Sequence, residues 1–171
     1  MEIRPAVTGD AMDVARVHVK SWQAGYCGLL PDAYLDALRP EDRAPGYDFT
    51  HADPAVPYTL VATEADEVLG FATTMPSRDG SLANYGELGA LYVAPDHWRK
   101  GIGTMLIAAA YKRLIQNGYR DALLWLLAGN TQTEHFYQEN GWRPDGIRRN
   151  ETVWGIKVVE LRYVRRLVPP V

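Results

Sequence analysis

The chain has 171 residues, of which 47% are hydrophobic and 23% charged, with a formal net charge of -3. This size and composition predict one globular domain over residues 1–171. No apolar run reaches the roughly 18 residues that cross a bilayer, and the N-terminus lacks a signal-peptide pattern, so we expect a cytoplasmic protein that does not bind membranes. The acidic balance gives no electrostatic footprint for nucleic acid, although residues 162–166 are locally basic.

Cysteine usage excludes two further classes. The only cysteine, Cys27, cannot form an internal disulfide, and no spacing of cysteines and histidines matches a zinc site. We therefore expect neither a disulfide scaffold nor a bound metal.

The N-terminal third predicts a strand followed by helices. Residues 2–7 are expected to form a short strand, and Thr8 to cap a helix that runs to about Ala24. A second short helix is expected at Asp32–Leu38. The stretch Pro40–Pro57, which is rich in proline and poor in aliphatic residues, predicts a mobile loop.

The remaining sequence alternates strands and helices. Two β-branched or aromatic runs around an acidic turn predict a hairpin, and a short uninterrupted apolar run predicts a central strand. Thr131 and Glu134 fit a capping box at the start of a helix. The expected elements are strands at 58–63, 68–75 and 87–93, a helix at about 101–117, a strand at 122–127, a helix at about 131–140, and strands at about 152–154 and 158–163. This order predicts a mixed α/β sheet.

The most informative segment for function joins the strand that ends near Val93 to the helix that begins near Gly101. Gly101 and Gly103 allow the backbone to approach a ligand, and the free N–H groups of a helix N-terminus attract anions. Arg99 and Lys100 add positive charge, although a solvated flank is an equal reading of that pair. The pattern fits a pyrophosphate site, but taken alone it fits a flexible glycine loop better. It lacks the Gly-Lys-Ser/Thr of nucleoside triphosphate sites and the third glycine of dinucleotide sites.

This loop resembles the phosphate motif Q/R-x-x-G-x-G/A of the GNAT superfamily, the acyl-CoA-dependent N-acyltransferases, and the resemblance extends along essentially the whole chain. Trp98 stands where the family has Gln or Arg. The block from Leu123 to Asn130, followed by His135 to Trp142, is similar to a second segment of that family. The resemblance implies a mixed, mostly antiparallel sheet (α/β or α+β) of about seven strands with about four flanking helices.

The resemblance also implies acetyl-CoA as the cosubstrate and a set of residues that bind it. Asn130 is expected to hydrogen-bond the pantetheine arm and Tyr137 to lie near the sulfur. The implied cofactor-binding residues are Tyr92, Val93, Arg99, Lys100, Gly101, Ile102, Gly103, Thr104, Asn130 and Tyr137.

Transfer to an amine requires control of protons. A free alkylamine has a pKa of about 10 and must be neutral to attack, so a base or a water relay helps at neutral pH. Several GNAT members carry a glutamate base at the position of Glu87, and a structural strand-edge carboxylate is the alternative. The Val93 N–H is expected, by resemblance, to stabilise the oxyanion. Tyr137 is expected to donate a hydrogen bond to the leaving thiolate.

The acceptor is expected to be a small-molecule amine. An aromatic acceptor cleft could be formed by Trp22, Tyr26, Tyr47, Tyr85 and Tyr92, with core packing as the alternative. The expected substrate-binding residues are Trp22, Tyr26, Tyr85 and Glu87. A peptide N-terminus or a lysine side chain remains open as an alternative acceptor. Assembly of the protein into a homodimer also remains open. The rival functions are a CoA-sensing module without turnover and a nucleotide-binding enzyme.

Overall fold

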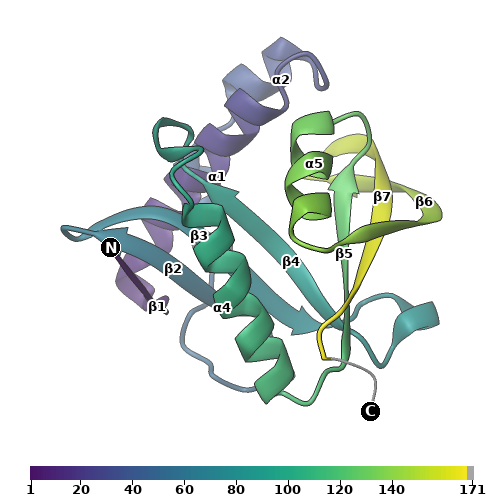
Figure 1. Ribbon diagram of the computed structural model, residues 1–171. Helices are drawn as coiled ribbons and strands as arrows, with labels where there is room; N and C mark the ends of the chain where they lie inside the picture. The colour runs from purple at the N-terminus through teal and green to yellow at the C-terminus, as the bar shows by residue number, and fades with distance from the viewer. Residues whose placement is uncertain (169–171) are drawn as a thin grey trace.

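The computed structural model describes residues 1–168 and shows a seven-stranded sheet in the order β1-β2-β3-β4-β5-β7-β6 (Figure 1). All neighbouring strands are antiparallel except β4 and β5, which run parallel. The strands are β1 (Glu2–Pro5), β2 (Tyr58–Glu64), β3 (Glu67–Pro76), β4 (Gly86–Val93), β5 (Asp121–Leu127), β6 (Arg143–Val153) and β7 (Ile156–Arg166). The helices are α1 (Ala11–Gly25), α2 (Asp32–Ala37), α3 (Pro40–Arg43), α4 (Ile102–Gln116) and α5 (Thr131–Glu139).

Helices cover both faces of the sheet. Helices α4 and α5 lie on the front face in Figure 1, and α1 lies behind the sheet. The largest buried cluster joins α4 to β4 and β5 through residues such as Leu106, Leu88 and Leu124. A second cluster packs Val14 and Val17 of α1 against the other face. The apolar run at Ala122–Leu127 forms β5 in the interior of the sheet, as predicted, with every residue buried or half-buried.

The feature that positions the site is the divergence of β4 from β5. The two strands pair only at Gly86 and Glu87, opposite Ala122 and Leu123, and then separate toward their carboxyl ends (Figure 1). Beyond Glu87, the edge of β4 that would face β5 therefore has no strand partner among residues 1–168. Unpaired peptide groups in the middle of a sheet need other partners, such as side chains or a ligand.

Two predictions about chain segments are wrong. The stretch expected to be a mobile loop contains α3 and a 3₁₀ turn at Ala44–Gly46, and Tyr47 and Phe49 pack against the α1-side cluster. Strand β6 begins at Arg143 rather than near Thr152. Its residues are mostly exposed because it is an edge strand, so it lacks the alternation of apolar residues that identifies a half-buried strand.

Both predicted helix caps also differ. The chain enters α1 through a 3₁₀ turn at Thr8–Asp10, where the Asp10 carboxylate accepts the Val7 N–H at 2.8 Å. At α5 the cap is Asn130 rather than Thr131, and Glu134 accepts a hydrogen bond from the Tyr163 hydroxyl instead of closing a capping box.

Within residues 1–168, no helix has the length and apolar character needed to cross a membrane. No cluster of His, Cys, Asp and Glu in that range is arranged to hold a metal ion.

Candidate active site

A cleft of about 880 Å³ occupies the gap between the diverging strands. Its walls come from four elements: the carboxyl ends of β4 and β5, the loop before α4, and α5. The end of α1 closes it from behind with Ser21, Gly25 and Tyr26. This volume is within the usual range for a site that holds a small molecule or cofactor.

The loop before α4 forms one end of the cleft. Gly101 caps α4 with φ of +80°, a left-handed conformation that favours glycine, and no side chain of the described residues 1–168 caps the helix. The first backbone bond of the helix runs from the Met105 N–H to the Gly101 carbonyl, so the N–H groups of residues 102–104 have no partner within the helix. Arg99, also left-handed with φ of +60°, lines the cleft beside them. This end of the cleft suits a diphosphate.

Gly103 has a role that the sequence did not reveal. A Cβ placed on Gly103 would lie 3.2 Å from Cζ of Phe136 on α5, tighter than an ordinary contact. The glycine therefore allows α4 and α5 to approach closely, in addition to lining the cleft. Close approach keeps the free N–H groups of α4 beside the wall formed by α5.

Trp98, which stands where the family motif has Gln or Arg, makes a contact of its own. Its indole N–H donates to the Val93 carbonyl at 2.7 Å, and the Ser21 hydroxyl donates to the same oxygen at 2.9 Å. The next peptide N–H, that of Ala94, donates to the Leu69 carbonyl on β3 at 2.8 Å. The peptide between Val93 and Ala94 is thus held from both sides, by α1 and the phosphate loop on one and by β3 on the other.

This arrangement sets the direction of the free backbone groups of β4. Residues along an antiparallel strand alternate in the side to which their peptide groups point. Because Ala94 points to β3, Val93 and Leu91 direct their N–H groups toward the gap left by β5. Both residues line the cleft. Sequence reasoning identified Val93 but missed Leu91, Ser21 and Trp98, since hydroxyl and indole donors to a strand carbonyl have no short motif.

Asn130 lies at the start of α5, 8% exposed, and lines the cleft. Its Oδ1 accepts the Thr133 N–H at 3.2 Å, which fixes the side chain at the helix end. Within residues 1–168, the Asn130 amide nitrogen makes no hydrogen bond, so the amide retains a donor for a ligand.

Tyr137 reaches the cleft from α5 and is 7% exposed. Its ring packs edge-on against Phe136 and Trp142. Burial raises the pKa of Tyr137 well above its usual value, because the phenolate would lose its hydration. The hydroxyl therefore remains protonated at neutral pH and can act as a hydrogen-bond donor.

Glu87 does not lie in the cleft. It sits at the closed end of the gap, 2% exposed, where β4 still pairs with β5. Its Oε2 accepts the backbone N–H of Arg78 at 2.9 Å, and its Oε1 lies 2.6 Å from Nη2 of the same residue. Both carboxylate oxygens are therefore occupied by Arg78. Glu87, expected as the general base, thus lies outside the cleft lining and is paired with Arg78, whose own side chain is 63% exposed.

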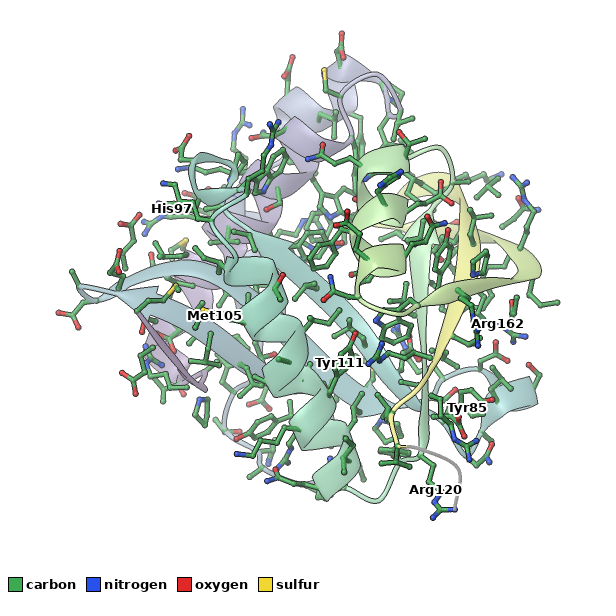
Figure 2. The ribbon with its side chains drawn as sticks, viewed as in Figure 1. Tyr85, His97, Met105, Tyr111, Arg120 and Arg162 are labelled. Carbon is green, nitrogen blue, oxygen red and sulfur yellow. The ribbon has the colours of Figure 1, made fainter. Side chains whose placement is uncertain are left out.

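The expected aromatic pocket is only partly assembled. Tyr26 and Tyr92 line the cleft. Trp22 lies outside the lining and is 5% exposed; its ring stacks on that of Trp154, with 4.2 Å between the ring centroids. Tyr85 precedes β4 and lies at the opposite end of the strand from the cleft; Figure 2 shows it far from His97, which lines the cleft. The assignments of Trp22 and Tyr85 to the wall of an acceptor pocket are therefore corrected.

Most of the expected cofactor residues do meet at the cleft. Lys100 is the exception, since it is exposed and outside the lining. The residues brought together are Tyr92, Val93, Arg99, Gly101, Ile102, Gly103, Thr104, Asn130 and Tyr137.

Comparison with known proteins agrees with this geometry. Residues 21–142 match the model of the Acetyltransferase (GNAT) family. The chain belongs to this family. The chain is 29% identical to the uncharacterised N-acetyltransferase YuaI of Bacillus subtilis, over 93% of the chain and 89% of the relative. It is 31% identical to phosphinothricin N-acetyltransferase of Streptomyces coelicolor, over 87% of this chain and 85% of that relative.

The fold is shared with solved structures. The PaiA N-acetyltransferase from Thermoplasma acidophilum, crystallised in complex with coenzyme A, superposes with a TM-score of 0.70 at 21% identity, covering 96% of this chain and 98% of that one. The expected family and the seven-stranded fold class are confirmed, and the chain is an acetyl-CoA-dependent N-acetyltransferase.

Proposed function

We propose that this GNAT enzyme transfers the acetyl group of acetyl-CoA to the primary amine of a small molecule by direct attack in a ternary complex. The observation that carries the proposal is one continuous cleft that joins the free N–H groups of α4 to the hydroxyls of Tyr26 and Tyr137. A diphosphate at one end and a reacting thioester at the other would both find suitable partners there.

The residues present fit acetyl-CoA along its length. Arg99 and residues 101–104 would hold the diphosphate, and Asn130 would offer its amide to the pantetheine arm. The thioester supplies an activated acetyl group. The N–H groups of Leu91 and Val93, held in direction by the contacts to Ser21 and Trp98, would stabilise negative charge on the carbonyl oxygen during attack. The Tyr137 hydroxyl would donate to the leaving sulfur.

Two observations support a small acceptor. Relatives are named for acetylation of phosphinothricin and of spermidine, both small amines. The hairpin between β6 and β7 also packs onto the helices behind the cleft, with Trp154 stacked on Trp22 and the Tyr34 hydroxyl bonded to the Trp154 carbonyl at 2.8 Å. We propose that this packing narrows the approach to the cleft for an extended polypeptide.

The test is release of CoA thiol from acetyl-CoA in the presence of an amine panel. The panel contains phosphinothricin, spermidine, a peptide with a free N-terminus, and an N-terminally blocked peptide with one lysine. We expect turnover with at least one of the small amines. Turnover with the peptides alone would transfer the assignment to a protein acetyltransferase. Stabilisation by acetyl-CoA without any thiol release would instead indicate a CoA-binding module.

A further inference from the structure

The cleft is lined by residues from both faces of the sheet. The phosphate loop, α4 and α5 border it on one face (Figure 1). On the face that α1 covers, its lining includes Tyr26, Tyr92 and Leu127. Trp125 also lines it and points to the same face as Leu127, because side chains alternate along a strand. Since acetyl-CoA would occupy the α4 side, the α1 side is left for the approach of an acceptor amine.

Glu160 of β7 lies next to this α1-side end of the cleft. It is directly opposite Leu127 in the pairing of β5 with β7, and opposite side chains share a face with their Cβ atoms about 5 Å apart. Arg149 leads to the same place: its guanidinium carbon lies 4.0 Å from the centroid of the Trp125 ring, and its Nε donates to Oε1 of Glu160 at 2.9 Å. Glu160 therefore borders the wall that Trp125 and Leu127 form.

Glu160 retains one carboxylate oxygen for a ligand. Both contacts from Arg149, through Nε and Nη2, go to Oε1. Within residues 1–168, Oε2 accepts no hydrogen bond, and the side chain is 14% exposed. A carboxylate that is largely withdrawn from water attracts a cation more strongly than an exposed one. Burial raises the pKa of Tyr92 above its usual value, and the charge of Glu160 raises it further, so the field of this carboxylate reaches the lining of the cleft.

The charges around Glu160 favour a cationic ligand over an anionic one. Three nearby arginines are each bonded to carboxylates: Arg78 to Glu87, Arg149 to Glu160, and Arg162 to both Asp79 and Asp145. Glu151 lies 3.9 Å from Arg149 and adds another negative charge. The carboxylates of this group outnumber its guanidinium groups, and the excess of negative charge attracts cations.

The reacting nitrogen itself is a poor partner for this carboxylate. A free alkylamine has a pKa of about 10 and must lose a proton before it attacks, whereas a neighbouring carboxylate favours the charged form. A second ammonium group of the same molecule binds a carboxylate without this penalty. Neighbouring strands lie about 5 Å apart, so a short alkyl chain spans the distance from the gap between β4 and β5 to a side chain on β7.

We propose, on the basis of the proposed acetyl transfer, that Glu160 selects the acceptor by binding a second ammonium group of a diamine or polyamine through its free oxygen. The other nitrogen of the same molecule then reaches the thioester in the gap. Glu160 takes no part in making or breaking bonds, and Arg149 holds it through Oε1 beside Trp125. The substrate class is therefore an aliphatic amine with a second positive charge.

The experiment compares kcat/KM, measured by thiol release, for putrescine, butylamine and γ-aminobutyrate. These amines have chains of equal length and carry at the far end an ammonium group, no charge and a carboxylate. Cadaverine, one methylene longer than putrescine, completes the series. The variants are Glu160→Gln and Glu160→Asp, with acetyl-CoA affinity and melting temperature measured in parallel. Glu151→Gln is the matched control, because it removes the same charge from a side chain that is 44% exposed.

The wild type should prefer putrescine to butylamine by about tenfold or more in kcat/KM, the effect of one hydrogen bond between charged groups. Glu160→Gln should reduce this preference to within about twofold and leave butylamine turnover, acetyl-CoA affinity and melting temperature little changed. Glu160→Asp keeps the charge but withdraws it by one methylene, so the preference should move from putrescine toward cadaverine. The control should keep the wild-type preference, since exposed charges contribute little.

Several results would overturn the role of Glu160 while leaving acetyl transfer intact. These are a wild type without a preference for putrescine, a Glu160→Gln enzyme with the wild-type preference, and equal losses with both amines, which would indicate a structural role. A wild-type preference for γ-aminobutyrate would assign this end of the cleft to anions. If Glu160→Gln fails to fold, Glu160→Asp decides, and an unchanged order of the two diamines rejects the inference. Absence of thiol release with every amine would instead reject the proposed function itself.

Discussion

The two ends of β4 differ in how their backbone groups are paired. At its carboxyl end the strand has lost β5 as a partner, and its peptide groups are held in place by an indole, a serine hydroxyl and β3. At its amino end the strand is fully paired, and the carboxylate of Glu87 is saturated by Arg78. Free donors thus concentrate at the open end, while the charged group that looks most catalytic is part of the framework at the closed end.

The open end depends first on the phosphate loop. Gly101→Pro should abolish the thermal stabilisation by acetyl-CoA, because proline cannot adopt the left-handed φ of +80° that starts α4. Gly101→Asn is the matched control, since asparagine tolerates this conformation and should keep most of the stabilisation. The measurement is the melting temperature with and without acetyl-CoA. Equal stabilisation of the proline variant would place diphosphate binding elsewhere.

The next largest effect at the open end concerns Tyr137. Tyr137→Phe should lower kcat about tenfold or more and leave acetyl-CoA affinity within a few-fold, because the hydroxyl matters as charge builds on sulfur after binding. Steady-state kinetics and a binding titration separate the two quantities. A change in acetyl-CoA affinity with kcat unchanged would show that Tyr137 contributes to cofactor binding and does not donate a hydrogen bond during the reaction.

The sequence predicted the open end better than the closed end, for physical reasons. A glycine loop at a helix start, and an asparagine before the next helix, use local backbone geometry that short motifs record. The roles of Trp98 and Glu87 depend instead on how the chain turns back on itself: Trp98 bonds the Val93 carbonyl at the end of β4, and Arg78 of the preceding loop closes over Glu87. Strand β6 was missed because an exposed edge strand needs no apolar alternation.

A smaller effect tests how the open end is held. Trp98→Phe should lower kcat/KM about fivefold, which corresponds to the loss of one hydrogen bond of about 1 kcal/mol. The loss should be no larger because Ser21 still donates to the Val93 carbonyl. Ser21→Ala should cost a similar amount. The double variant should lose more than the product of the two single effects, since the carbonyl then has neither donor. If the two losses were strictly additive in free energy, the two side chains would act independently of each other rather than through the shared Val93 carbonyl.

The smallest effect on turnover is expected at the closed end. Glu87→Gln should keep kcat within about twofold of the wild type at every pH, because the carboxylate is bound by Arg78 and lies outside the cleft lining. The variant should instead lose about 1 kcal/mol of stability, as a charge-assisted bond becomes a neutral one. Arg78→Met is the matched control and should also lower the melting temperature without changing the pH profile of kcat. A Glu87→Gln defect that is large at neutral pH and shrinks as the pH rises toward the pKa of the acceptor amine would show that Arg78 swings away during turnover and that the two ends of β4 share the chemistry.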